Sequence, residues 1–366
     1  MTAFRVAVLP GDGIGPEVTR AAMSVLSAAC AVDGVRLETS EHAIGGAAVR
    51  SLGSPLPAGT LAACQGADAV FLGAVGDPAF ENEPRERKPE TGLLALRRGL
   101  GVFANIRPAR VLPGLENLGP LKPEVAAGLD VVIVRELLGG LYFGEPRGFD
   151  RAAGRAVNSL VYTKDEVVRI AEVAFRIAEG RRGLVTSVDK ANVLETSVLW
   201  RETVIEVGKR FPSVRLEHQY VDSCAMALVL TPAHFDVVLT ENLFGDILSD
   251  EAGALVGSLG LLPSASLGAG PGLFEPVHGS APALAGRDVA NPVGAILSAA
   301  LLAREGLSLE GVARRIEGAV TRALSGGRTA DLAGGGNAVS ASRFTANVLE
   351  CLEPALTSRE SRSGGC

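Results

Sequence analysis

The chain has 366 residues, 47% of them hydrophobic and 21% charged, as expected for a globular protein large enough for two lobes. Its formal net charge of −6 gives no reason to expect binding to nucleic acid or to an anionic membrane. The five cysteines form no Cys-x-x-Cys pair, no apolar run is long enough to span a bilayer, and the first residues do not resemble a signal peptide. We therefore expect a cytoplasmic protein without a zinc site or a disulfide framework.

Apolar runs that predict buried strands alternate with helical patterns along most of the chain. Strands are expected at residues 4–9, 35–39, 69–72, 131–134, 184–187, 216–220 and 237–239, and helices at 17–31, 164–179, 191–209 and 291–304. The glycine-rich segment from Gly139 to Asn158 interrupts this alternation and is expected to form an extended arm or a hairpin. The alternation itself favours an α/β architecture.

The first strand leads into the glycine-rich turn Gly11–Pro16, which opens a helix. Such a turn suggests a dinucleotide-binding fingerprint, with Glu38 or Glu41 as the acid that binds the ribose. However, its spacing is not Gly-x-Gly-x-x-Gly, and proline at this step is better explained by a helix start. A Rossmann site is therefore not expected here.

Three arginines are candidate ligands for an anion. One helix face carries an acid, two leucines and an arginine, at Glu90, Leu93, Leu94 and Arg97. This pattern also suits an ordinary amphipathic helix with solvated ends. Arg107 and Arg135 lie in or after apolar strand segments, and the carboxyl ends of strands are where α/β sites form. Three guanidinium groups would suit a substrate with two carboxylates, because each can bind a carboxylate through two hydrogen bonds.

Asp246 and Asp250 are four residues apart, which places both carboxylates on one face of a helix. An isolated pair of this kind is usually a solvated acidic face. Here small residues continue the same face and leave room for a hard divalent cation, which prefers oxygen ligands. Asp222, at the end of a strand pattern, could complete such a metal site.

Lys190 and Tyr142 are candidates for acid–base chemistry. Lys190 follows a strand pattern and is expected to start a helix, where the helix dipole disfavours a cation, so it could act as a general base. Tyr142 lies among glycines that could bring its hydroxyl to a site, although a tyrosine packed in the arm is the more ordinary interpretation. The small-residue loop His278–Pro282 has free backbone donors and could hold a nucleotide or be a simple turn.

Together these segments resemble the 3-isopropylmalate dehydrogenase family of β-hydroxyacid oxidative decarboxylases, over about residues 4–350. The motifs that carry the resemblance are Leu9–Glu17, Val134–Gly144, Ser187–Val193 and Asn242–Asp250. The family implies a two-domain, non-Rossmann α/β fold and a homodimer whose active sites are shared between subunits. Residues 1–102 and 257–366 would form the cofactor-side domain. Residues 103–256 would form the central domain for metal binding and dimerisation, with an arm at about 138–160 in the dimer interface.

The resemblance also implies roles for individual residues. NAD and Mg²⁺ or Mn²⁺ would be the cofactors, and a small hydroxy diacid the substrate. The metal ligands would be Asp246, Asp250 and the partner subunit's Asp222; the base would be the partner subunit's Lys190, and the acid Tyr142. The substrate would contact Arg97, Arg107, Arg135, Asp222, Glu90, Leu93, Leu94 and Val193. The cofactor would contact Gly76, Glu90, His278, Gly279, Ser280, Ala281, Pro282, Ala283 and Asn291.

Two positions depart from the family pattern. NAD-dependent members usually carry aspartate where this chain has Ala283, and NADP-dependent relatives usually carry Lys-Tyr where it has Ala283-Leu284. Leu138 replaces a common threonine. NAD remains the expected cofactor, and 3-isopropylmalate in leucine biosynthesis the expected substrate. The alternatives are a paralogue acting on tartrate, homoisocitrate or another alkylmalate, and a non-catalytic regulatory subunit, against which an intact Lys190, Tyr142 and aspartate set argues.

Overall fold

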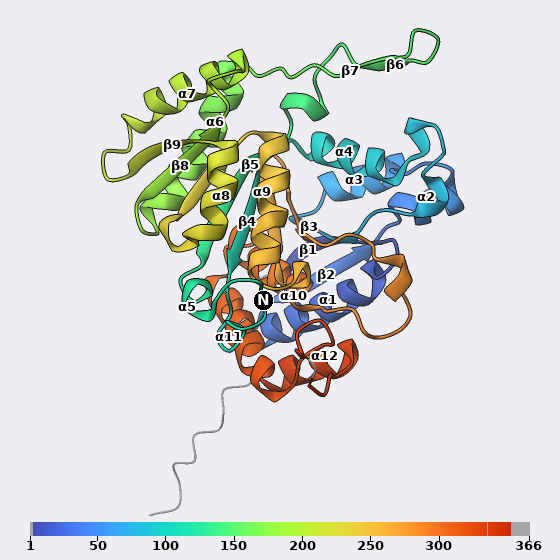
Figure 1. Cartoon of the computed structure of the whole chain (residues 1–366). Coiled ribbons are helices and arrows are strands. Elements are labelled where there is room, and N and C mark those ends of the chain that lie inside the picture. The colour runs from blue at the N-terminus through green and yellow to red at the C-terminus, as the bar shows by residue number, and fades with distance from the viewer. Residues whose placement is uncertain (1–2, 335, 353–366) are drawn as a thin grey trace, which may run out of the picture.

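One large mixed β-sheet runs through the molecule (Figure 1). The computed structural model describes residues 3–334 and 336–352. The strands of this sheet are β1 (Ala3–Gly11), β2 (Arg36–Glu41), β3 (Ala69–Ala74), β4 (Val102–Arg110), β5 (Asp130–Glu136), β8 (Leu184–Asp189), β9 (Arg215–Tyr220), β10 (Val237–Thr240), β11 (Pro263–Gly268) and β12 (Gly272–Pro276). Across the sheet they lie in the order β2-β1-β3-β12-β11-β4-β5-β10-β8-β9.

The direction of the strands changes in the middle of the sheet. β4 pairs antiparallel with both β5 and β11, and β11 pairs antiparallel with β12. The strands on either side pair in parallel. The sheet therefore has two parallel wings, β2-β1-β3-β12 and β5-β10-β8-β9, joined through the antiparallel strands β11 and β4.

Helices cover both faces of the sheet, as in other α/β proteins (Figure 1). They are α1 (Gly15–Val32), α2 (Gly45–Leu52), α3 (Ala58–Gln65), α4 (Pro89–Leu100), α5 (Pro123–Ala126), α6 (Lys164–Glu179), α7 (Glu195–Gly208), α8 (Val221–Leu230), α9 (Asn242–Leu255), α10 (Val293–Leu301), α11 (Glu310–Gly326) and α12 (Ala341–Glu350). Within the described ranges none of these helices has the length and apolar character needed to cross a membrane.

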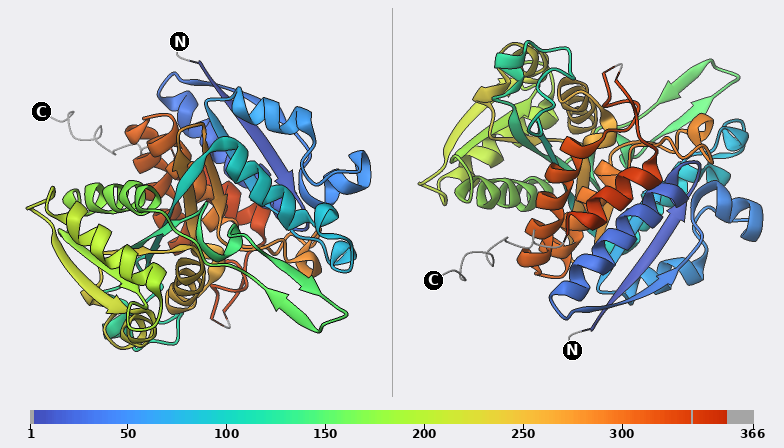
Figure 2. Two further views of the ribbon diagram at one scale, coloured as in Figure 1. Left: turned by 90° about the horizontal axis from the view of Figure 1, so that it is seen from above. Right: turned by 90° about the horizontal axis from the view of Figure 1, so that it is seen from below.

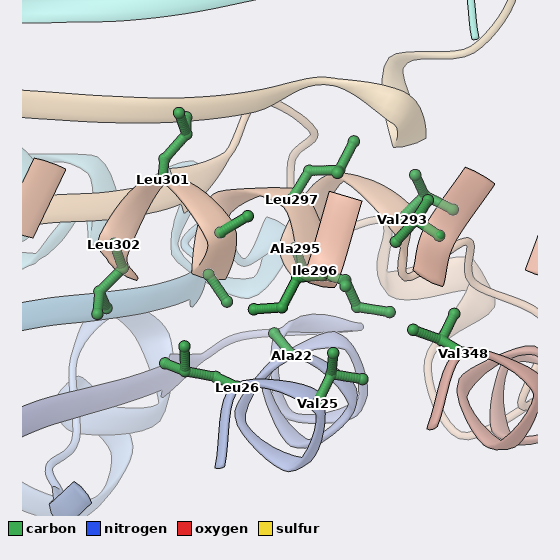
Figure 3. Packing of buried hydrophobic residues seen from close by; sticks show 14 of the residues in the cluster. Ala22, Val25, Leu26, Val293, Ala295, Ile296, Leu297, Leu301, Leu302 and Val348 are labelled. Atoms are coloured by element: carbon green, nitrogen blue, oxygen red, sulfur yellow. The ribbon is translucent and has the colours of Figure 1, made fainter. Parts of the chain in front are cut away.

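The largest core joins the two ends of the chain. Ala22, Val25 and Leu26 of α1 pack beneath Ile296 of α10, and Val348 of α12 closes the same cluster (Figure 3). Every residue of α10 is buried, which agrees with its almost wholly apolar sequence. A second core forms under α6 and α7 from the middle of the chain. The predicted domain boundaries near residues 102 and 256 stay a prediction, because the sheet is continuous across them.

The arm expected at Gly139–Asn158 contains a hairpin. Its strands are β6 (Gly148–Asp150) and β7 (Arg155–Val157), which pair antiparallel. Figure 2 shows the hairpin extending away from both lobes. The prediction of an extended arm or hairpin is therefore confirmed, whereas its place in a dimer interface stays a prediction.

The structure corrects one expectation about secondary structure and adds strands that the sequence did not predict. The helix expected at 191–209 begins only at Glu195, because residues 191–193 form a turn closed by a hydrogen bond from the Val193 amide to the Lys190 carbonyl. Lys190 therefore lies in a loop and not at a helix start. Strands β4, β11 and β12 were not predicted. In β4, polar Asn105 and Arg107 alternate with apolar residues and Pro108 follows, so no apolar run is present.

Candidate active site

The three predicted arginines are all buried. Arg97 of α4, Arg107 of β4 and Arg135 of β5 are 8%, 8% and 2% exposed. On β4, Arg107 donates from Nε to Asn105 Oδ1 at 2.7 Å and from Nη1 to Ser249 Oγ at 2.6 Å. Burial lowers the pKa of Arg107 to about 10, with the charge of Arg135 acting in the same direction.

The helix face predicted around Arg97 is present on α4. Leu93 and Leu94 are half-buried, whereas Glu90 is exposed. The Arg97 guanidinium donates from Nη2 to Glu275 Oε1 at 2.7 Å, at the end of β12. Arg97 is therefore not the solvated end of an amphipathic helix. Glu275, three residues before His278, links this arginine to the predicted cofactor loop.

The Asp246 carboxylate contacts several of the predicted site residues. Its Oδ1 accepts a hydrogen bond from Arg135 Nη1, and its Oδ2 accepts one from the Tyr142 hydroxyl at 2.7 Å. Although burial acts to raise it, the pKa of Asp246 is lowered below its usual value, chiefly by Arg135. Burial and the bond to Asp246 raise the pKa of Tyr142 to about 12. Tyr142 is thus held in its protonated form, as an acid requires.

Asp250 lies one turn beyond Asp246 on α9. Arg107 Nη1 is 3.6 Å from an oxygen of each carboxylate, and the Asp250 side chain is 61% exposed. Burial raises the pKa of Asp250, with Arg107 opposing the shift. The two aspartates offer the hard oxygen atoms that Mg²⁺ or Mn²⁺ prefers. In the part of the chain that the structure describes, no group of three or more potential ligands forms, so this pair fits a cation only with ligands from elsewhere.

Lys190 and Asp222 form a separate pair. Lys190 Nζ lies 2.5 Å from Asp222 Oδ1, and this bond lowers the pKa of Asp222. Among the described residues neither side chain forms a hydrogen bond or an ion pair with the arginines, Asp246 or Asp250. Asp222 and Val193 are largely exposed. One chain therefore contains the predicted site in two pieces.

The predicted cofactor residues converge at the ends of β1, β3 and β12. A Cβ atom on Gly76 would lie 3.3 Å from Ser280 Oγ and 3.5 Å from Glu90 Oε1. The Ile14 amide donates to the Ser280 carbonyl at 2.8 Å. The buried Asp12 carboxylate accepts hydrogen bonds from the amides of Gly46, Ala47 and Gly76. The glycine-rich turn thus organises neighbouring loops, which agrees with its interpretation as a helix start and not as a Rossmann fingerprint.

His278 and Asn291 lie beside Asp331. The side chain of Asn291 donates to Asp331 Oδ2 at 2.9 Å, and burial lowers the pKa of His278. His278 Nε2 is buried without a hydrogen-bond partner among the described residues. The loop then passes through Ala281, with φ +37°, to a short turn that exposes the predicted residues Pro282 and Ala283. An unpaired buried nitrogen beside exposed loop atoms fits an adenosine-bearing cofactor.

Several residues at the site were not predicted from the sequence. Asn105, Asn242, Ser249, Glu275 and Asp331 contact the predicted groups directly. Asn242 lies inside a recognised motif and so carried a signal, whereas Glu275 lies in β12, a strand that was not predicted. Asp331 carried none, because its contacts come from chain segments that are distant in sequence.

Buried arginines opposite two carboxylates, beside glycine-rich loops, define an α/β protein with a site for a small acidic molecule. A family model described as isocitrate/isopropylmalate dehydrogenase matches residues 5–348, and the chain belongs to this family. The predicted fold is thereby confirmed.

Relatives with this fold are close in sequence. The chain is 54% identical over 336 residues to a 3-isopropylmalate dehydrogenase of Prochlorococcus marinus (strain MIT 9313), covering 91% of this chain and 94% of the relative. It is 55% identical over 334 residues to a 3-isopropylmalate dehydrogenase of Anaeromyxobacter dehalogenans (strain 2CP-C), covering 90% and 95%.

Two solved structures of dehydrogenases are similar to this chain in fold and in sequence. The crystal structure of an isocitrate dehydrogenase from Methylococcus capsulatus has a TM-score of 0.85 and 35% identity, covering 95% of this chain and 99% of the other. The apo form of a β-decarboxylating dehydrogenase from Thermococcus kodakarensis has a TM-score of 0.78 and 37% identity, covering 95% and 96%.

Proposed function

We propose that this chain is an NAD-dependent 3-isopropylmalate dehydrogenase of leucine biosynthesis. It converts (2R,3S)-3-isopropylmalate to 4-methyl-2-oxopentanoate and CO₂. The observation that carries the proposal is the identity of 54–55% over nine-tenths of the chain to proteins named for this activity. The buried arginines, the paired aspartates and Tyr142 support it. Together they provide groups that can bind two carboxylates, hold a divalent metal ion and donate a proton, as the reaction of a hydroxy diacid requires.

The arginines hold and orient the substrate. Arg97, Arg107 and Arg135 bind its two carboxylates, and their burial strengthens these charge-assisted hydrogen bonds. Half-buried Leu93 and Leu94 face the isopropyl group, with Val193 contributed by the partner subunit. A carboxylate buried unpaired against these leucines would cost several kcal/mol, so isocitrate is excluded more strongly than another alkylmalate.

Two side chains move the protons. The partner subunit's Lys190 accepts the proton of the 2-hydroxyl group as the substrate is oxidised, and Tyr142 donates its proton to the enol carbon after CO₂ has left. The raised pKa of Tyr142 keeps that proton available at neutral pH. Bound NAD supplies the hydride acceptor, and Mg²⁺ or Mn²⁺ held by Asp246, Asp250 and the partner subunit's Asp222 supplies Lewis-acid stabilisation of developing negative charge.

A homodimer would bring the two pieces of the site together. Exposed apolar side chains gather on α8, on α9 and beside Lys190, at Val193, Tyr220, Met226, Val229, Leu230 and Ile247. Phe149 and Val161 are exposed in and next to the arm. Apolar surface of this extent supports a subunit interface next to Lys190 and Asp222. The cytoplasmic location stays a prediction.

The deciding experiment is an assay of the purified protein with 3-isopropylmalate, NAD⁺ and Mg²⁺ or Mn²⁺. We expect NADH formation that stops on addition of EDTA and returns with excess metal. NADH at background level would overturn the function, and activity that persists in EDTA would overturn the metal role. Comparing kcat/KM for isocitrate, homoisocitrate, tartrate and other alkylmalates, with NAD⁺ and with NADP⁺, tests the paralogue alternative.

A further inference from the structure

Asn242 occupies the first position of α9 and is completely buried. It shares a helix face with Asp246 and Asp250, because the three residues are spaced four apart. Its side chain therefore lies at one end of the stripe that carries both acidic groups. The sequence had given it no role of its own.

The Asn242 side-chain amide makes a second connection between Arg135 and the segment of Tyr142, in addition to the one through Asp246. Its Oδ1 accepts hydrogen bonds from Arg135 Nε at 3.0 Å and from Arg135 Nη2 at 2.7 Å. Its Nδ2 donates to the Gly139 carbonyl at 3.0 Å, immediately before the short 3₁₀ turn Gly140–Tyr142. One amide thus holds the diacid-binding arginine and the segment that carries the acid Tyr142.

The remaining contacts of Arg135 follow from this arrangement. With Nε and Nη2 occupied by Asn242, Arg135 directs Nη1 to Asp246, the same carboxylate that accepts the Tyr142 hydroxyl. Gly245 permits the approach, because a Cβ atom there would lie 2.7 Å from Arg135 Cγ. Asparagine suits the position, since it accepts and donates through one planar group, which aspartate and leucine cannot do.

We propose that Asn242 is a positioning residue that fixes Arg135 and the Tyr142 turn as one unit. The substrate-binding group and the proton donor are then set together before substrate arrives. Asn242 touches neither the substrate nor the reacting atoms, and it acts through Arg135 and Tyr142. The inference rests on the proposed dehydrogenase function.

The test is a double-mutant cycle between Asn242→Ala and Tyr142→Phe. Asn242→Ala removes hydrogen bonds to a charged group, so we expect KM for 3-isopropylmalate to rise about 10- to 100-fold and kcat to fall about tenfold. In the Tyr142→Phe background the same change should raise KM as before but lower kcat by less than about twofold, because there is no acid left to misplace.

Tyr162→Phe is the matched control. The Tyr162 hydroxyl accepts a hydrogen bond from the Asn242 backbone amide at 2.9 Å, but among the described residues it forms no hydrogen bond with the Asn242 side chain. We expect its KM to stay near that of the unaltered protein. Additive kcat effects, an unchanged KM in Asn242→Ala, or the same KM rise in Tyr162→Phe would each overturn the proposal.

Failure of the proposed function can be told apart from failure of this inference. If the unaltered protein forms no NADH, the proposed function is wrong. The positioning of Arg135 by Asn242 is then still tested by calorimetric measurement of 3-isopropylmalate binding. Asn242→Ala should then weaken binding about 10- to 100-fold, with a melting temperature close to that of Tyr162→Phe. Equal affinity in the two variants would overturn the inference.

Discussion

The two pieces of the proposed active site differ in how far one chain completes them. The arginines and Asp246 lie in a largely buried network in which each charged group already has partners on β4, β5, β12 or α9. Lys190 and Asp222 pair with each other at the surface, beside exposed Val193 and Tyr220. The buried piece is organised by the folding of one chain, whereas the exposed piece depends on assembly.

This difference has an energetic basis. A buried guanidinium without a partner would be costly, so the fold must satisfy the arginines whether or not substrate is present. A surface ion pair such as Lys190–Asp222 contributes little to stability and can be rearranged at small cost. Residues of the exposed piece can therefore be changed with little effect on folding, which makes them the best places to test the chemistry.

Lys190→Ala should have the largest effect. Loss of the general base is expected to lower kcat by about 10²–10⁴-fold with little change in melting temperature, because the side chain is only partly buried and its ion-pair partner Asp222 is exposed. Steady-state assays and thermal unfolding measure the two quantities. Mixing Lys190→Ala subunits with Asp246→Asn subunits, after dissociation and reassembly, should restore activity if sites are shared. Mixtures no more active than either variant would contradict sharing.

Tyr142→Phe should have the next largest effect, a fall in kcat of about 10²-fold. The pH dependence sharpens this test. Because burial and the bond to Asp246 raise the pKa of Tyr142 to about 12, the acid stays protonated over the working range. No loss of kcat through tyrosine ionisation is therefore expected between about pH 8 and about pH 10. A kcat profile in which activity falls near pH 9 in the unaltered protein but not in Tyr142→Phe would contradict this assignment.

Leu230→Arg tests whether the exposed piece, Lys190 and Asp222, functions only in a dimer. A charge introduced into an apolar interface should weaken dimerisation by about 10- to 100-fold and reduce activity in proportion to the dimer lost. Sedimentation measures the subunit equilibrium. Leu52→Arg is the control, because Leu52 on α2 is also highly exposed but lies outside the apolar cluster of α8 and α9. Equal sedimentation of the two variants would argue against this face as the interface.

Ala283→Asp should have the smallest effect. One added hydrogen bond to the adenosine ribose would improve KM for NAD⁺ by about three- to tenfold and disfavour NADP⁺. Because Ala283 is exposed in a short turn, the change should not affect folding. The measurement is kcat/KM with each cofactor. An unchanged ratio of kcat/KM for NAD⁺ to kcat/KM for NADP⁺ would mean that the adenosine ribose does not bind at residue 283.

The sequence predicted those parts of the molecule that depend on local pattern. Helix α6 has the predicted bounds, and Thr163 and Glu166 form a reciprocal cap at its start. The helix face with Arg97 and the pairing of Asp246 with Asp250 followed from helical spacing. Strand β4 was missed because its inward residues include Arg107 and Asn105, so a strand that builds a site does not look like one that builds a core.

Other features could not be predicted because they join distant parts of the chain. The bonds from Arg97 to Glu275 and from Asn291 to Asp331 cross 178 and 40 residues. Lys190 was assigned to a helix start because the helical pattern does not mark where the preceding turn ends. The chain departs from the family pattern at Ala283 and at Leu138. Ala283 occupies an exposed turn, whereas no contact among the described residues explains an effect of the Leu138 side chain.

The core that joins the chain ends has a consequence for the order of folding. The apolar face of α1 packs against α10, α11 and α12, so it stays without its partners until nearly the whole chain has been synthesised. The core beneath α6 and α7 is built from residues 104–239, which are complete much earlier. Contacts over long sequence separations form slowly. We therefore expect the core that contains α1 to be completed last, after the core beneath α6 and α7 has formed.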